Sequence, residues 1–308
     1  MSALDRLVVI LGPTATGKSS LAIALAEKLH GEILACDSTQ VYSRFDIGTA
    51  KVPQDERRGI PHHLLDILEP AEIFTAGDYQ RRASEMLADL RRRRKLPIVT
   101  AGTGLYLRAL LEGLSDAPTR SEELRERLRD KAAKGGPEAL HKLLARLDPE
   151  AARRIAERDT QKVIRALEMR ILAGKPVGEI HRRGRKGLEG HEVKKIGLLP
   201  ARPALYARID ARVRTMIEQG WIEEVRRLIS GGVPEDAKPF QFIGYSQIRE
   251  HLAGRLDKED AIHRIQQATR QFAKRQITWF YKEPEVHWFS GFGDDPEILR
   301  ASVEFLES

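Results

Sequence analysis

The segment that most limits the possible fold is a glycine-rich stretch near the start of the chain, ending in lysine and serine. It matches the pattern G-x-x-x-x-G-K-[ST] and consists of Gly12, Pro13, Thr14, Ala15, Thr16, Gly17, Lys18 and Ser19. A continuous apolar run at residues 7–11 precedes it, and a helical pattern at residues 19–29 follows it. This strand–loop–helix context predicts a P-loop, in which backbone N–H groups and the helix N-terminus hold a phosphate chain.

Two side chains of the loop have expected roles of their own. Lys18 would bring a mobile positive charge to the phosphates, and Ser19 would provide a hydroxyl ligand for Mg²⁺. The glycines let the backbone approach the phosphate oxygens closely because they carry no side chain. The loop therefore predicts a phosphate ligand. It does not specify the reaction, since kinases, NTPases and other transferases share it.

Apolar runs and helical patterns alternate along the first third of the chain and define the expected fold class. Further short apolar runs occur at residues 32–36, 64–67, 97–100 and 195–199. Helical patterns lie between several of them, at residues 19–29 and 76–92. Such runs are typical of strands buried on both faces of a parallel sheet. We therefore predict an α/β fold with a P-loop NTPase-like, doubly wound parallel sheet.

The alternation stops after about Asp116, and a group of short helices is expected to follow. Their ranges are 121–129, with Ser121 as N-cap, then 138–146, 149–158 and 161–172, with a break at residues 135–137. A glycine- and arginine-rich loop covers residues 184–190. We predict a P-loop core domain from residues 1–116 and 195–308, with an all-helical insertion domain at residues 117–194. A long amphipathic helix is expected at residues 203–230.

The positive charge of the chain is concentrated in the predicted insertion. The whole sequence has 52 Lys and Arg against 45 Asp and Glu, a net charge of +7. Residues 117–194 hold 20 of the basic and 13 of the acidic residues, so this quarter carries an excess equal to that of the whole chain. Such a concentration suits a polyanionic partner such as RNA.

The sequence also excludes several classes of protein. No run reaches the ~18 consecutive apolar residues that a membrane span needs, and the first residues lack the regions of a signal peptide. Cys36 is the only cysteine, which excludes an internal disulfide and a cysteine-based zinc cluster. We expect a cytoplasmic, monomeric protein with no membrane partner.

Polar residues follow two further strands at the same expected edge of the sheet. Asp37 comes directly after the run at residues 32–36, and Thr103 lies in a glycine-rich turn after the run at residues 97–100. Ligands of doubly wound sheets bind at the carboxyl ends of the strands, so both side chains are expected to face the P-loop. A carboxylate there could act as a general base or help to order Mg²⁺, or it could simply cap a turn.

Several motifs together resemble those of the bacterial tRNA dimethylallyltransferases, also called tRNA isopentenyltransferases. They occur in the order found in that family and comprise Gly12 to Ser19, Asp-Ser-x-Gln-x-Tyr at 37–42, Gly-Thr-Ala-Lys at 48–51, Pro-His-His at 61–63, Gly-Thr-Gly-Leu-Tyr at 102–106, and Thr-Arg-Gln-Phe-Ala-Lys-Arg-Gln-x-Thr-Trp-Phe at 269–280. The resemblance runs from about Leu7 to Phe289, nearly the whole chain.

The resemblance implies a reaction and its partners. A dimethylallyl group would pass from dimethylallyl diphosphate to the N6 amine of an adenosine in tRNA, giving N6-(dimethylallyl)adenosine and diphosphate. In this family the adenosine lies next to the anticodon on its 3′ side, in tRNAs that read codons beginning with U. The base is flipped out of the anticodon stem-loop for modification. Mg²⁺ is the implied cofactor.

The resemblance also implies roles for single residues. The P-loop with Lys18, Ser19 and Mg²⁺ would bind the diphosphate and stabilise it as it leaves. Asp37 would accept the proton from the N6 amine as that nitrogen attacks the allylic carbon. Thr103 would contact the substrates, and Arg208 resembles an arginine that the family directs at the diphosphate. Without the resemblance, Arg208 could equally belong to a solvated helix face.

Contacts with tRNA are implied for three groups of residues. Beside the flipped base these are Asp37, Ser38, Thr39, Gln40 and Thr103. In the insertion they are Arg125, Gln161, Lys162, Val163, Ile164 and Arg165. In the second part of the core they are Phe240, Gln241, Phe242, Ile243, Gly244 and Tyr245. Arginines and aromatic rings are the usual contacts of single-stranded RNA loops, and residues 266–281 interleave basic and aromatic side chains in the same way.

Two positions depart from the family pattern. Ala101 stands where the family has the first glycine of Gly-Gly-Thr-Gly, which the end of a strand with negative φ tolerates. Lys162 stands where the family often has arginine, which keeps the charge but loses a bidentate fork.

Three other functions are compatible with a P-loop in this chain. A small-molecule kinase or NTPase would use ATP, but it gives no reason for a basic helical insertion. A non-catalytic RNA-binding protein would bind tRNA and tolerate the loss of Asp37. An adenine-nucleotide isopentenyltransferase would perform the same chemistry on a free nucleotide, and the basic insertion favours tRNA over that acceptor.

Overall fold

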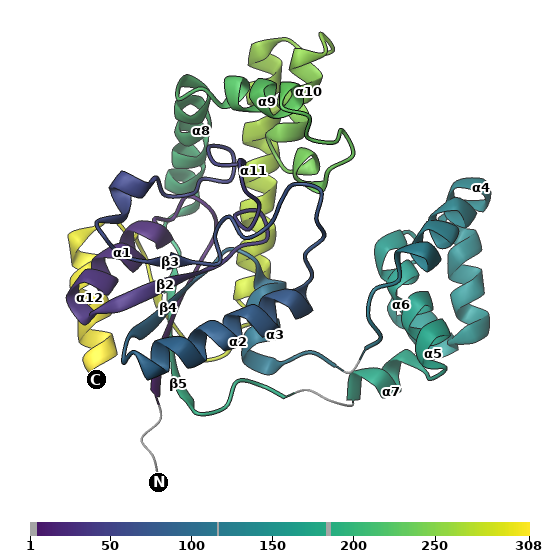
Figure 1. The fold of residues 1–308 in the computed structure, drawn as a ribbon, viewed down its shortest axis with the longest axis horizontal. Helices are drawn as coiled ribbons and strands as arrows, with labels where there is room; N and C mark the ends of the chain where they lie inside the picture. Colours follow the sequence, from purple (N-terminus) through teal and green to yellow (C-terminus); the bar gives the residue numbers. More distant parts are fainter. Residues whose placement is uncertain (1–4, 116, 183–185) are drawn as a thin grey trace. The chain divides into compact units, whose positions relative to one another are not determined.

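The computed structural model describes residues 5–115, 117–182 and 186–308 (Figure 1). The chain forms two compact units, one from Met1–Leu110 with Glu189–Ser308 and the other from Leu111–Leu188. The first unit is built on a six-stranded sheet, and the second is helical. Within the described residues, no helix has the length and apolar character needed to cross a membrane.

The strands of the sheet are all parallel and follow the order β3-β2-β4-β1-β5-β6. Their bounds are Asp5–Leu11 for β1, Gly31–Cys36 for β2, His62–His63 for β3, Leu96–Ala101 for β4, His191–Leu198 for β5 and Val286–Phe289 for β6. Every residue of β2 is buried, as are the last five of β1, which accounts for the continuous apolar runs in the sequence. The predicted α/β fold with a doubly wound parallel sheet is confirmed.

The first unit also contains helices, some of which pack on the sheet and others on neighbouring helices. They are α1 Lys18–Leu29, α2 Ala76–Arg92, α3 Gly104–Glu112, α8 Arg202–Glu218, α9 Trp221–Ser230, α10 Tyr245–Leu252, α11 Lys258–Phe280 and α12 Pro296–Glu307, with short 3₁₀ helices η1 Gln54–Arg57 and η2 Lys238–Gln241. One buried cluster joins sheet residues such as Ile10 and Ile98 to Leu21 of α1 and Leu306 of α12. This packing fixes the start of α1, and with it the P-loop, at the carboxyl end of β1.

Two predicted elements of the first unit differ from the structure, and in the second unit the helix predicted at residues 149–158 ends at Arg154. The strand expected at residues 64–67 is wrong, because Leu64 and Asp66 have positive φ angles of 64° and 53°, which a strand does not allow. The single helix expected at residues 203–230 is also wrong. It is broken at Gly220, whose φ of 98° separates α8 from α9 and changes the direction of the chain.

The second unit contains α4 Glu122–Leu147, α5 Pro149–Arg154, α6 Thr160–Ala173 and α7 Val177–Arg182. Ser121 caps α4 as predicted, and the expected break appears as a kink at Gly136 (φ 75°, ψ 167°). The predicted end of the insertion at residue 194 is too late, because residues 191–194 already belong to β5 of the sheet. The loop predicted at residues 184–190 begins outside the described residues.

A buried carboxylate holds the first helix of this unit to the third. Glu168 of α6 has a fully buried side chain and accepts hydrogen bonds from the Ser121 N–H and from the guanidinium groups of Arg125 and Arg165. Burial alone would raise the pKa of Glu168, but these hydrogen bonds outweigh it and lower the pKa to about 2. Its stabilising contribution is therefore present above the ordinary value of 4.5 and is lost as the pH falls towards 2.

Replacing Glu168 with alanine should destabilise the helical unit by about 3 kcal/mol, because two arginines lose their buried partner. Hydrogen exchange of the amides in α4 and α6 of the full-length protein measures this loss. The exchange of β1 and β4 should stay unchanged.

The exposed pair between Glu123 and Arg127 provides a matched control on α4. Glu123→Gln should change the exchange of the same amides by less than about 1 kcal/mol, since solvent screens this pair. Equal effects of the two substitutions would show that Glu168 does not organise the unit.

Candidate functional site

The P-loop joins the end of β1 to the start of α1 and takes its shape from two glycines. Gly12 and Gly17 have φ angles of 148° and 83°. A Cβ on Gly12 would lie 2.6 Å from the carbonyl oxygen of Leu198, and one on Gly17 would lie 2.9 Å from the backbone nitrogen of Gly293. Neither contact is possible for a side chain, so the loop requires glycine at both places.

Lys18 lies folded over the P-loop. Its Nζ donates hydrogen bonds to the carbonyl oxygens of Gly12 and Pro13, both at 2.9 Å. Burial lowers the pKa of Lys18 to about 8; the charge of Asp37 acts in the opposite direction, and that of Arg212 lowers it further. The ammonium group is thus held ready in the loop, with only backbone carbonyls as hydrogen-bond partners among the described residues.

A cavity of about 270 Å³ opens above the loop. Its lining includes Thr14 to Ser19 of the P-loop, together with Asp37, Gln40, Arg208, Arg212 and Gln276. A second cavity of about 490 Å³ adjoins it, since Thr14, Asp37, Arg212 and Gln276 line both. The second is largely apolar on the side formed by α8 and α11, where Ile209, Val213, Met216, Ile265 and Phe272 line it.

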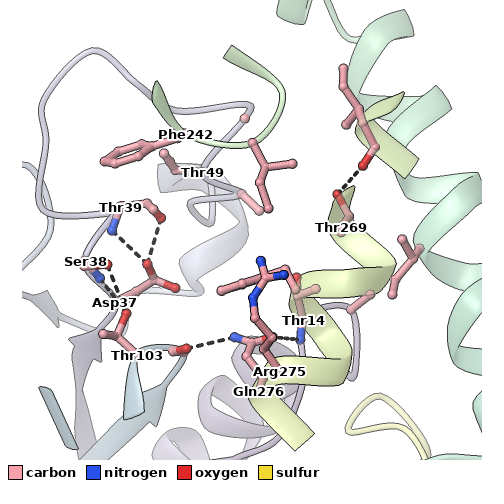
Figure 2. A pocket seen from close by; sticks show the side chains of 18 of the residues that line it. Thr14, Asp37, Ser38, Thr39, Thr49, Thr103, Phe242, Thr269, Arg275 and Gln276 are labelled. Carbon is pink, nitrogen blue, oxygen red and sulfur yellow. Dashed lines mark hydrogen bonds between the residues drawn. The ribbon is translucent and has the colours of Figure 1, made fainter. Parts of the chain in front are cut away.

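Asp37 lies where the two cavities meet, directly after β2 (Figure 2). Its Oδ1 accepts hydrogen bonds from the backbone N–H of Thr39 at 2.9 Å and from the Thr39 hydroxyl at 2.7 Å. Its Oδ2 lies so close to Gly102 that a Cβ there would approach to 2.2 Å. One carboxylate oxygen is therefore used to fix the group, and no protein hydrogen bond to the other is present among the described residues.

Thr103 is tied to the same turn. Its Oγ1 accepts a hydrogen bond from the Ser38 N–H at 2.9 Å and lies 3.2 Å from the Ser38 hydroxyl. The backbone N–H groups of Gly102 and Thr103 both donate to the carbonyl oxygen of Cys36. The ends of β2 and β4 thus form one rigid element, and the predicted neighbours Asp37, Ser38, Thr39 and Thr103 lie together (Figure 2).

Gln276 of α11 links this element to the P-loop, which the sequence did not indicate. Its Oε1 accepts a hydrogen bond from the Thr14 N–H, and its Nε2 donates to the Gly102 carbonyl oxygen, both at 2.8 Å (Figure 2). The side chain is buried. In the sequence, its only distinguishing feature is its place in the block at residues 269–280, where the basic and aromatic residues form the visible pattern.

Two arginines of α8 reach the smaller cavity. Arg208 forms a bidentate ion pair with Asp294, with N–O distances of 2.8 and 3.1 Å, and this contact lowers the pKa of Asp294. Arg212, one turn later, has no hydrogen-bond or ion-pair partner among the described residues and lines both cavities. Burial and the charge of Arg208 lower its pKa. The i, i+4 spacing of the two arginines was a signal that the sequence analysis missed.

The segment at residues 240–245 divides into two groups. Gln241, Phe242 and Ile243 line the larger cavity. Phe240 and Tyr245 are fully buried instead, and Gly244 is needed because a Cβ would lie 1.9 Å from the Trp221 ring. The side chains of Phe240 and Tyr245 thus belong to the core, and RNA contacts by this segment stay a prediction.

The residues of the helical unit that were predicted to contact RNA are exposed, buried in the core or paired with Glu168. Gln161 and Lys162 are exposed, while the side chains of Val163 and Ile164 lie in the hydrophobic core of that unit. Arg125 and Arg165 bind Glu168, so part of their charge is already neutralised. The sequence could not separate these cases because helix packing decides them.

A metal site made of protein side chains alone is not found in the described part of the chain, which contains no group of three or more His, Cys, Asp or Glu residues placed for one. Ser19 is partly exposed and lines the smaller cavity. Mg²⁺ commonly takes few protein ligands and completes its shell with phosphate oxygens and water, so one hydroxyl beside a phosphate cradle fits this ion.

Comparisons with known proteins agree with this geometry. The model of the family described as IPP transferase matches residues 40–283. A tRNA dimethylallyltransferase of Solibacter usitatus is 50% identical over 298 residues, which cover 97% of each chain. The solved tRNA isopentenylpyrophosphate transferase of Bacillus halodurans is 37% identical, with a TM-score of 0.71 over 98% of this chain and 97% of that one. A eukaryotic dimethylallyltransferase solved while acting on tRNA is 28% identical, with a TM-score of 0.81 over 98% of this chain and 80% of that one. The resemblance found in the sequence motifs is confirmed, and the chain belongs to the IPP transferase family.

Proposed function

We propose that this protein transfers a dimethylallyl group from dimethylallyl diphosphate to the N6 amine of an adenosine in tRNA. The observation that carries the proposal is the pair of adjoining cavities with Asp37 at their junction. One cavity is lined by a P-loop and two arginines, and the other by apolar side chains. A diphosphate ester of a short hydrocarbon has the two chemistries that such a pair accommodates, and membership of the family points to tRNA as the acceptor.

The smaller cavity suits the diphosphate. The P-loop N–H groups, the start of α1, Lys18 and Arg212 all present positive charge or hydrogen-bond donors to it. As the C–O bond of the donor breaks, negative charge grows on the leaving diphosphate, and these groups stabilise it. Mg²⁺ bound at Ser19 and the phosphates would neutralise part of the same charge. Arg208 would exchange part of its ion pair with Asp294 for a phosphate oxygen.

Asp37 is suited to the proton transfer. The adenine N6 forms a bond to the allylic carbon while the bond from that carbon to the diphosphate oxygen breaks. The N6 proton then passes to Oδ2 of Asp37, the carboxylate oxygen with no protein hydrogen bond among the described residues. Thr39 holds Oδ1, so the carboxylate does not need to reorient during the reaction. Thr103 and Ser38 lie beside the same position and would contact the base or the donor.

The finer features of the acceptor belong to the same proposal. We place the modified adenosine next to the anticodon on its 3′ side, in tRNAs that read codons beginning with U. The exposed side chains of Gln161 and Lys162, and Gln241, Phe242 and Ile243 of the larger cavity, would contact the flipped base or its neighbours.

The acceptor is tested with labelled dimethylallyl diphosphate, Mg²⁺ and either total tRNA or AMP. Label should enter tRNA. Label found only in AMP would indicate the adenine-nucleotide activity instead, and turnover of ATP without prenyl transfer would indicate a kinase or NTPase.

Asp37→Asn should lower the transfer rate by about 10²–10⁴-fold, because an amide keeps the shape and the Thr39 contact but cannot accept the N6 proton. The tRNA affinity, measured by filter binding, should stay within a few-fold of the wild-type value. Thr39→Ala provides the comparison: it removes one of the two hydrogen bonds to Oδ1 and should lower the rate far less, because the backbone N–H at position 39 still holds the carboxylate. A wild-type rate in the Asn variant would mean that Asp37 is not the base.

Lys18 predicts a pH dependence for binding of the anion. Because the pKa of Lys18 is about 8 in the free protein, the side chain is charged below that pH and progressively neutral above it. The affinity for inorganic diphosphate should therefore fall as the pH rises from 7 to 9, as measured by calorimetry. Lys18→Arg stays charged throughout, so the ratio of the two affinities removes the titration of the diphosphate itself. Parallel profiles would rule out a titrating Lys18.

A further inference from the structure

A loop that contributes no strand to the sheet forms one wall of both cavities. It covers residues 46–51, and Gly48, Thr49 and Ala50 line the larger cavity, with Thr49 and Ala50 also lining the smaller one. Internal hydrogen bonds run from the Ala50 N–H to Ile47 O and from the Lys51 N–H to Asp46 O. Ala50 has a φ of 55°, which is unfavourable for alanine, so the surrounding contacts must hold the loop in this shape.

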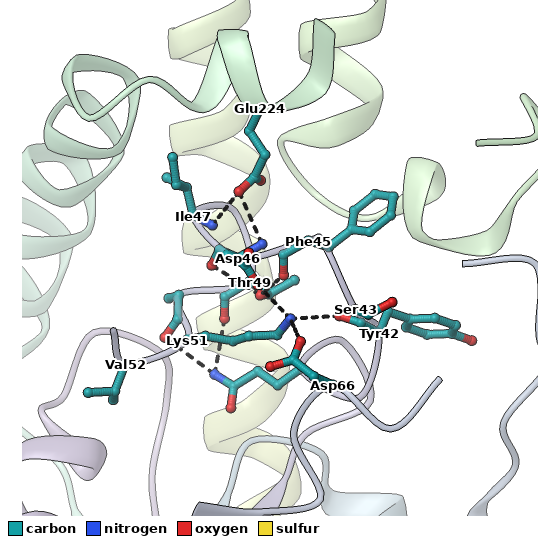
Figure 3. Close-up of polar contacts among 12 residues, drawn as sticks. Tyr42, Ser43, Phe45, Asp46, Ile47, Thr49, Lys51, Val52, Asp66 and Glu224 are labelled. Carbon is teal, nitrogen blue, oxygen red and sulfur yellow. Dashed lines mark hydrogen bonds and ion pairs between the residues drawn. The ribbon is translucent and has the colours of Figure 1, made fainter. Parts of the chain in front are cut away.

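Glu224 of α9 holds the start of this loop (Figure 3). Its side-chain Oε2 accepts hydrogen bonds from the N–H groups of Asp46 at 3.1 Å and Ile47 at 2.8 Å. Its Oε1 accepts a hydrogen bond of 2.6 Å from the Tyr245 hydroxyl. Glu224 is only 5% exposed and has no cationic partner among the described residues. These three donors are thus what compensates the burial of its charge.

Lys51 holds the other end of the loop (Figure 3). Its ammonium group, on a side chain that is 3% exposed, donates to the Tyr42 carbonyl oxygen at 2.6 Å and to the carboxylates of Asp46 and Asp66. Asp46 therefore connects the two buried charges. Its backbone N–H binds Glu224, and its side chain binds Lys51.

The loop in turn places residues of the site. Gln40 lines the smaller cavity, and its Nε2 donates a hydrogen bond to the carbonyl oxygen of Thr49 at 3.0 Å. At the same time Gly48 packs against Trp221, the first residue of α9, so closely that a Cβ would lie 2.2 Å from the indole nitrogen. A shift of the loop relative to α9 would therefore move Gln40 and reshape the cavity wall.

We propose that Glu224 is a positioning residue for the transfer reaction, acting through the loop at residues 46–51 without touching the substrates. This inference rests on the proposed function. The carboxylate acts like a helix N-cap supplied from another element, because it satisfies two backbone N–H groups that have no other partner among the described residues. Without it, the two N–H groups lose their protein partner, and the loop relaxes away from the geometry that the cavities need.

The test compares Glu224→Ala with Glu224→Gln. The alanine variant should lower the transfer rate at saturating substrates by about 10²-fold, since small misplacements of site groups have effects of this size. The glutamine variant should recover most of the rate, because its amide oxygen can still accept both N–H groups while its NH₂ donates to the Tyr245 oxygen. Glu223→Gln, at an exposed neighbour paired with Arg226, should behave as the wild type.

Two further measurements separate positioning from folding. In Glu224→Ala, the amides of Asp46 and Ile47 should exchange rapidly while those of β1 and α11 stay protected, and the affinity for inorganic diphosphate should stay within about threefold. Loss of protection throughout the first unit, or a wild-type rate with rapid exchange at the loop, would overturn the proposal. If the wild-type protein transferred no prenyl group at all, the proposed function would fail, and the exchange and diphosphate data would still decide whether Glu224 holds the loop.

Discussion

The parallel register of the four central strands is the constraint on which the site depends. It brings Leu11 of β1, Cys36 of β2, Ala101 of β4 and Gly197 of β5 to the same edge of the sheet. The P-loop, the Asp37 turn and the Thr103 turn leave the sheet at three of these points. The distances between these three segments are therefore set by the spacing of the strands. Backbone hydrogen bonds from Gly102 and Thr103 to the Cys36 carbonyl oxygen also fix the segment after β4 to the end of β2.

Those parts of the site that follow a strand directly could be predicted from the sequence. A buried strand gives a continuous apolar run, and the residues after it must lie at its carboxyl end, so Lys18, Asp37 and Thr103 were located without knowledge of the packing. Local rules also place the helix at residues 76–92, where Thr75 and Asp78 form a capping box. The same rules failed at Leu64 and Asp66, because positive φ angles in non-glycine residues are imposed by distant contacts such as that between Asp66 and Lys51.

Residues from the second part of the core were harder to find because their roles exist only across the fold. Gln276 binds Thr14 and Gly102, which are 262 and 174 residues away, and Glu224 binds Asp46 at a separation of 178 residues. No pattern of neighbouring residues encodes such contacts. In the structure, such contacts are recognised by buried polar side chains in the helices, because each buried polar group must find hydrogen-bond partners.

The arginines around Glu168 and the cations around the P-loop differ in how their charge is compensated. In the helical unit Glu168 offsets Arg125 and Arg165, so that cluster is complete without a ligand. Around the P-loop, Lys18 has only carbonyl partners, and Arg212 has no partner within the described residues. Burial lowers the pKa of both side chains, so an anionic group beside them would favour their charged forms. On the proposed function, the diphosphate of the donor would supply this counter-charge, both when bound and as it leaves.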